Sequence, residues 1–108
     1  MIRAAVLALL AFAAPASAHA IRMKVDVTAG EVCASVRYDG ADEDGGQVTV
    51  TLQRGESKEV VGTMKLGNDG SCAFPRPDAG KYRAIAQDDF GHRAVVDFEV
   101  LPLSLIHI

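Results

Sequence analysis

The chain has 108 residues, a net charge of −3, 49% hydrophobic and 6% aromatic residues, and no tryptophan. A chain of this length accommodates one domain. It is acidic and has few aromatic side chains, so it lacks the basic surface and the stacking platforms of nucleic-acid-binding proteins. We therefore expect no nucleic-acid partner.

The first 18 residues have the pattern of a secretory signal peptide. Arg3 supplies a positive charge, residues 4–14 form an unbroken apolar run, and residues 16–18 are small, as a signal peptidase requires. As a helix the apolar run spans about 16 Å, too short for a bilayer core of about 30 Å. A buried helix of the mature domain is the alternative. Cleavage after residue 18 leaves His19 as the N-terminus, and an equally well-formed site after residue 20 leaves Ile21.

Loss of the leader leaves a domain at residues 19–102, which we expect in the periplasm or elsewhere outside the cytoplasm. Ten basic and fourteen acidic residues remain once Arg3 is removed, a net charge of −4. Residues 103–108 match what a common sequencing-library adapter encodes in frame, so we interpret them as a non-native tail. A genuine short apolar tail is the alternative. On the first interpretation the domain is truncated, and the missing part can hold a membrane tether.

Alternation of apolar and polar residues dominates the mature chain. It predicts β-strands, because side chains on a strand point alternately to its two faces. Turn residues such as those at 67–70 and 88–91 interrupt the pattern at regular intervals. About seven short strands in this arrangement are typical of an antiparallel β-sandwich, and we expect an all-β domain of this class. The expected strands lie around residues 23–27, 32–38, 48–53, 60–66, 74, 82–87 and 94–100.

The inward-facing residues of these strands should form one contiguous hydrophobic core. We expect it to contain Val25, Val27, Val36, Tyr38, Val48, Val50, Leu52, Met64, Phe74, Tyr82, Ala84, Val96 and Phe98.

Cys33 and Cys72 are the only cysteines, so the chain can form one intramolecular disulfide at most. Export permits such a bridge, and closing a loop of about 40 residues is worth roughly 4 kcal/mol. Strand parity argues against it. Cys33 falls on the face opposite Val32 and Ala34, whereas Cys72 shares the inward parity of Phe74. The sequence leaves both a disulfide and two unpaired thiols open.

Two histidines of the domain are candidate metal ligands. If cleavage follows residue 18, the amine and imidazole of His19 can chelate a soft or borderline metal such as nickel, cobalt or copper. His92 supplies a third nitrogen only if the fold brings it near. Alternatively, His19 lies in solvent and His92 merely flanks a hairpin turn. His107 falls in the suspected tail.

The sequence supports no other chemistry. Ser35, Ser57 and Ser71 sit in no nucleophile-elbow context, and paired carboxylates occur only in acidic loops, so we expect no enzymatic activity.

The acidic loop at residues 39–46 is a candidate calcium site because it is rich in carboxylates. Aligned on its glycine, however, this loop has no carboxylate at the first ligand position and no glutamate at the twelfth. We expect a solvated loop.

Several short motifs together resemble the carboxypeptidase-regulatory-like, or transthyretin-like, domains of exported bacterial proteins. The motifs are Gly30-Glu31-Val32, Val36-Arg37-Tyr38, Val48-Thr49-Val50, Asn68-Asp69-Gly70, Phe74-Pro75, Gly80-Lys81-Tyr82-Arg83 and Gly91-His92-Arg93. The resemblance covers nearly all of residues 21–100. It extends to small periplasmic proteins that accompany nickel and cobalt uptake transporters, which typically begin with Ala-His and continue into a membrane helix. This chain has Ala18-His19 but lacks the second histidine that often follows.

The resemblance implies a non-enzymatic accessory module of a nickel/cobalt uptake system. Such a module captures metal or contacts membrane transporter subunits, with His19 and His92 as the metal ligands. The alternative is a generic extracytoplasmic module that binds protein or glycan without metal.

Overall fold

The computed structural model describes residues 21–38 and 46–105. The expected strands are confirmed: seven form, in the expected places, and they are followed by a short 3-10 helix. The elements are β1 (Ile21–Val27), β2 (Glu31–Tyr38), β3 (Thr49–Arg54), β4 (Val60–Lys65), β5 (Ser71–Pro75), β6 (Gly80–Gln87), β7 (Arg93–Val100) and η1 (Leu103–Leu105).

Four of the sequence-based predictions fall on residues outside these ranges. They are the signal peptide at residues 1–18, the ligand role of His19, the solvated acidic loop and the position of His107, and all four stay predictions. None of the helical segments in the described ranges has the length and apolarity needed to traverse a bilayer.

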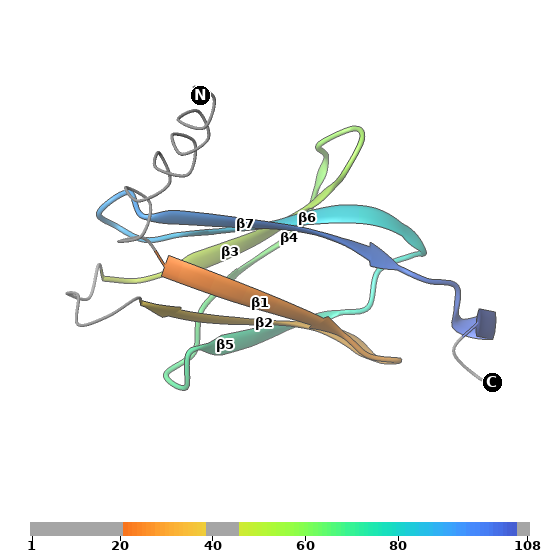
Figure 1. The fold of residues 1–108 in the computed structure, drawn as a ribbon, viewed down its shortest axis with the longest axis horizontal. Coiled ribbons are helices and arrows are strands. Elements are labelled where there is room, and N and C mark those ends of the chain that lie inside the picture. Colours follow the sequence, from red (N-terminus) through yellow and green to blue (C-terminus); the bar gives the residue numbers. More distant parts are fainter. Residues whose placement is uncertain (1–20, 39–45, 106–108) are drawn as a thin grey trace, which may run out of the picture.

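The strands form two antiparallel sheets that face each other as a β-sandwich (Figure 1). One sheet has three strands in the order β1-β2-β5, and the other has four in the order β4-β3-β6-β7. β1 lies against β7 at one margin, and β4 lies against β5 at the other. The chain passes from one sheet to the other after β2, β4 and β5, so segments distant in sequence meet at the ends of the sandwich.

The core fills the space between the sheets. Its buried residues are Ile21, Val32, Ala34, Val36, Val48, Val50, Leu52, Phe74, Tyr82, Ala84, Ala86 and Val100. The expected centre of the core is therefore confirmed, but its margins differ. β2 is the middle strand of its sheet, so Val32 and Ala34 are fully covered. β7 is an edge strand, and its inward residues Val96 and Phe98 are only partly buried.

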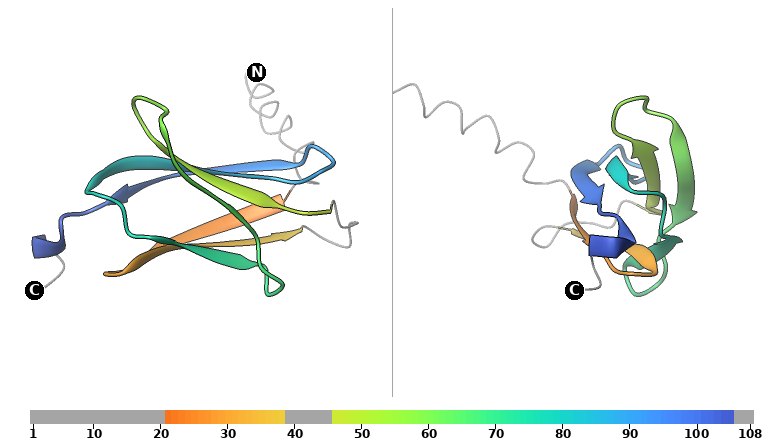
Figure 2. Two further views of the ribbon diagram at one scale, coloured as in Figure 1. Left: turned by 180° about the vertical axis from the view of Figure 1, so that it is seen from behind. Right: turned by 90° about the vertical axis from the view of Figure 1, so that its right-hand side faces the viewer.

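Four chain segments meet at one end of the sandwich (Figures 1 and 2). They are the start of β1, the end of β2, the start of β3 and the turn at residues 88–92 that joins β6 to β7. The strand register fixes this meeting, because Ile21 pairs with Tyr38 and Thr49 pairs with Gln87. η1 lies at the opposite end. Polar side chains attached to these four segments are therefore brought close together.

Leu52 tests the observed core. It is 1% exposed, and replacing a buried leucine with alanine removes packing contacts and leaves a cavity. We expect Leu52→Ala to lower the free energy of unfolding by about 2–5 kcal/mol in urea denaturation. The matched control is Val95→Ala, on the outer face of the same sheet and 40% exposed, which should change it by about 0.5 kcal/mol or less. Equal effects would contradict this core.

Candidate functional site

The turn between β6 and β7 is organised by the carboxylate of Asp88, the only charged residue buried among those described. One carboxylate oxygen, Oδ1, accepts hydrogen bonds from the backbone amides of Phe90 and His92, each at 2.9 Å. Aspartate commonly closes turns in this way, by accepting from the backbone two residues ahead. Gly91 completes the turn with a positive φ of 92°, a conformation that glycine adopts without strain. The turn therefore has a fixed shape.

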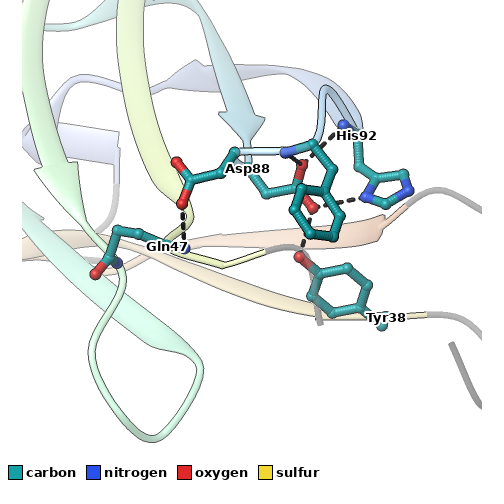
Figure 3. Close-up of polar contacts among 6 residues, drawn as sticks. Tyr38, Gln47, Asp88 and His92 are labelled. Atoms are coloured by element: carbon teal, nitrogen blue, oxygen red, sulfur yellow. Dashed lines mark hydrogen bonds and ion pairs between the residues drawn. The ribbon is translucent and has the colours of Figure 1, made fainter. Parts of the chain in front are cut away.

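The other carboxylate oxygen of Asp88 joins this turn to the opposite sheet (Figure 3). Oδ2 accepts a hydrogen bond from the hydroxyl of Tyr38, at the end of β2, at 2.5 Å. It also lies 2.6 Å from Nδ1 of His92. The rings of Tyr38 and His92 meet edge to face with their centroids 5.9 Å apart. One carboxylate thus holds a tyrosine, a histidine and a turn in a single cluster.

These contacts determine the protonation state of Asp88. Burial raises the pKa of its carboxyl. The hydrogen bonds from Tyr38, His92 and the backbone outweigh that effect and lower the pKa to about 2. At neutral pH the carboxylate is therefore anionic and can only accept hydrogen bonds.

The anionic carboxylate determines which nitrogen of His92 is available. A contact of 2.6 Å to an acceptor requires a proton on Nδ1. In the neutral imidazole the lone pair is then on Nε2. The side chain of His92 is 26% exposed, so it is reachable from solvent. The arrangement supplies an oriented nitrogen donor backed by a carboxylate, as metal-binding histidines usually have.

The neighbouring residue Asp89 fixes the start of β3 against the same turn. Its Oδ2 accepts a hydrogen bond from the backbone amide of Gln47 at 3.1 Å. Gly46 has a φ of 89°, and a Cβ atom there would lie 2.4 Å from Asp89 Oδ2. Only glycine therefore allows this close approach. Three of the four segments at this end are held together by two adjacent aspartates.

Of the two predicted metal ligands, the structure describes only His92. His92 lies at the end of the sandwich where β1 begins, and His19 precedes β1 by two residues but lies outside the described ranges. Within residues 21–38 and 46–105, no three or more histidine, cysteine or acidic side chains are grouped to hold a metal ion.

The two cysteines, on β2 and β5, are not part of this cluster. Both are free thiols in the structure. Cys33 pairs with Ala73 and Cys72 pairs with Ala34, so the two are one residue out of register and point to opposite faces, as strand parity indicates. A hydrogen bond to Glu31 raises the pKa of Cys33, and burial raises that of Cys72. Raised pKa values leave less thiolate for metal binding or nucleophilic attack.

Sequence reasoning singled out His92 but missed Asp88 and Tyr38 as its partners. The spacing of Asp88 and His92 around a glycine turn is a local signal that could have indicated an aspartate-closed turn. No local sequence signal indicates that Tyr38 contacts Asp88, because the two residues are 50 positions apart. Only the pairing of β1 with β2 and the facing of the two sheets place it there.

No protein-family model matches the chain, and no curated protein is significantly similar to it. The geometry of the cluster is therefore the basis for the functional proposal.

Asp88 makes the fold sensitive to acid in a defined range. Because its folded pKa is depressed to about 2, its contribution to stability is complete above the unfolded pKa of about 4 and is lost as pH falls towards 2. We expect Asp88→Asn to lower the free energy of unfolding at neutral pH, by about 1–3 kcal/mol for groups left poorly paired. The difference from the native chain should shrink below about pH 4.

The matched control for this measurement is Asp97→Asn. The pKa of Asp97 is also lowered, by its hydrogen bond with Arg83, but its side chain is 67% exposed. Exposed ion pairs contribute little, so this variant should resemble the native chain across the same urea titrations. A pH-independent difference between native protein and Asp88→Asn would contradict the role assigned to Asp88.

Proposed function

We propose that this chain is a non-enzymatic, exported β-sandwich module that captures nickel or cobalt as cargo, as an accessory component of a metal uptake system. The observation that carries the proposal is the Asp88–His92 pair, which orients the ring of His92, and this side chain is 26% exposed. Imidazole nitrogen suits divalent nickel, cobalt and copper better than hard cations such as magnesium or calcium.

The position of β1 supports His19 as the partner of His92. Ile21 pairs with Tyr38, whose ring contacts that of His92. His19 is two positions before Ile21, and a step of two extended residues spans about 7 Å. With cleavage after residue 18, the amine and imidazole of His19 are therefore attached within short reach of His92. Together they offer three nitrogen donors.

The motifs along residues 21–100 support the same proposal through their resemblance to carboxypeptidase-regulatory-like domains. A sandwich of two antiparallel sheets is compatible with that domain type. By the same resemblance, the module works in the periplasm, next to transporter subunits.

A metal-free module that binds protein or glycan is the second candidate. One observation favours it: the described residues contain no complete set of metal ligands. The two candidates differ in what they require of the N-terminus, because only metal capture depends on the free amine of His19.

The first test compares the chain processed after residue 18 with the same chain carrying one extra residue before His19. The extra residue removes the amine from the chelate. We expect nickel affinity, measured by calorimetry, to fall sharply in the extended form. Binding by the processed form should also weaken below about pH 6.5, where a typical imidazole becomes protonated. Mass spectrometry of both preparations verifies the N-terminus. Equal, weak binding by both forms would favour the metal-free module.

The second test addresses the carboxylate behind His92. Loss of such a partner typically costs about 10- to 100-fold in metal affinity. We expect Asp88→Asn to weaken nickel binding by this factor, and His92→Ala to weaken it at least as much. Asp97→Asn removes the same charge from the surface and should bind like the native chain. Unchanged affinity in folded Asp88→Asn protein would exclude His92 as an oriented ligand.

A further inference from the structure

The outer face of the four-stranded sheet carries an uncharged row of side chains that crosses all four strands. Thr51 on β3 stands opposite both Thr63 on β4 and Ile85 on β6. Ile85 in turn stands opposite Val95 on β7, the edge strand, where Val95 is 40% exposed. The outer face of an antiparallel sheet ordinarily faces water and is polar. A continuous β-branched row is therefore a candidate contact surface.

Charged side chains of opposite sign flank this row along β7. Arg93 is two positions before Val95 and Asp97 is two positions after it, so all three share the outer face. Arg93 is exposed and forms no ion pair with any residue of the described ranges. Asp97 accepts hydrogen bonds from Arg83 at 2.7 and 3.2 Å. A carboxylate has about four acceptor positions, so Asp97 can accept from a second cation.

A second copy of the chain complements this pattern when a two-fold axis runs along the uncharged row. The axis lays Val95 on Val95 of the second copy. It brings Arg93 opposite Asp97 of the second copy, and the same ion pair forms twice. On β4, whose Val60 pairs with Gln53 of β3, it brings Lys65 over Val60 of the second copy. Neither flanking row therefore meets a like charge.

The charges also distinguish this axis from the other two-fold axis that lays the same face on itself. That axis runs parallel to the strands and exchanges β4 with β7, the two edges of the sheet. It brings Lys65 against Arg93 of the second copy, because both lie in the row paired through Thr49 and Gln87. Like charges in close opposition across an interface disfavour association. The arrangement across the strands is the complementary one.

We propose that the outer face of the four-stranded sheet, around Ile85 and Val95, binds a second copy of this chain through a two-fold axis that runs across the strands. Four strands and three rows of side chains cover roughly 400 Å² of each copy, which is small for a stable complex. The dimer is therefore weak, and the chain is monomeric at the low micromolar concentrations suited to unfolding measurements. Strands run antiparallel across the contact, so the two His92 clusters lie at opposite ends and metal capture is not required.

Sedimentation equilibrium of the processed chain tests this contact. We expect the average mass to be near that of a monomer at about 10 µM and to approach that of a dimer at about 1 mM. Ile85→Lys encloses an unpaired charge at the centre of the face, away from the sheet edges, and should weaken association at least about tenfold. The matched control is Arg37→Glu on the outer face of the other sheet, which should associate like the native chain.

A mixing experiment tests the symmetry. Arg93→Glu alone opposes two acidic pairs across the axis, and Asp97→Arg alone opposes two basic pairs, so each variant should remain monomeric at about 1 mM. An equimolar mixture of the two restores both ion pairs and should form a mixed dimer. Circular dichroism verifies that each variant is folded. The proposal is overturned if the native chain stays monomeric at about 1 mM, if folded Ile85→Lys associates like the native chain, or if the mixture of folded variants stays monomeric.

Discussion

A carboxylate shielded from water at the end of a β-sandwich needs hydrogen-bond donors for its oxygens, because an unpaired charge out of contact with water is very costly. Among the described residues, four groups donate to Asp88: the hydroxyl of Tyr38, the imidazole of His92 and the backbone amides of Phe90 and His92. Removing any one of them leaves the carboxylate under-satisfied. This requirement holds β2, β6 and β7 in one arrangement at that end of the sandwich.

The same requirement gives the cluster its chemistry. A carboxylate that stays ionised needs a proton on Nδ1 of His92, and the ring is further held by its edge-to-face contact with Tyr38. Stability and ligand orientation therefore have one physical source. A histidine on an ordinary surface hairpin would sample several rotamers and both tautomers, and would pay for that freedom on binding a metal.

The fold was largely predictable from the sequence, whereas the site was only partly so. Apolar and polar residues alternate along β3 and β6 because one face of each strand is buried and the other is exposed. This alternation indicated inward residues such as Val50 and Ala84. The irregular register between Leu52 and Gln53 left no signal in that alternation. His92 was recognisable as a candidate from its place beside a turn, but its contact with Tyr38 depends on how the two sheets face each other. Packing between sheets is a tertiary property, which local patterning does not encode.

The tautomer of His92 tests this account most directly. Long-range proton–nitrogen NMR spectra of the imidazole, recorded on metal-free protein at neutral pH, distinguish a proton on Nδ1 from one on Nε2. The ionised carboxylate of Asp88 predicts that Nδ1 of His92 carries a proton, so that the lone pair of the neutral tautomer is on Nε2. A ring protonated on Nε2 alone, or one that averages between both tautomers, would contradict it.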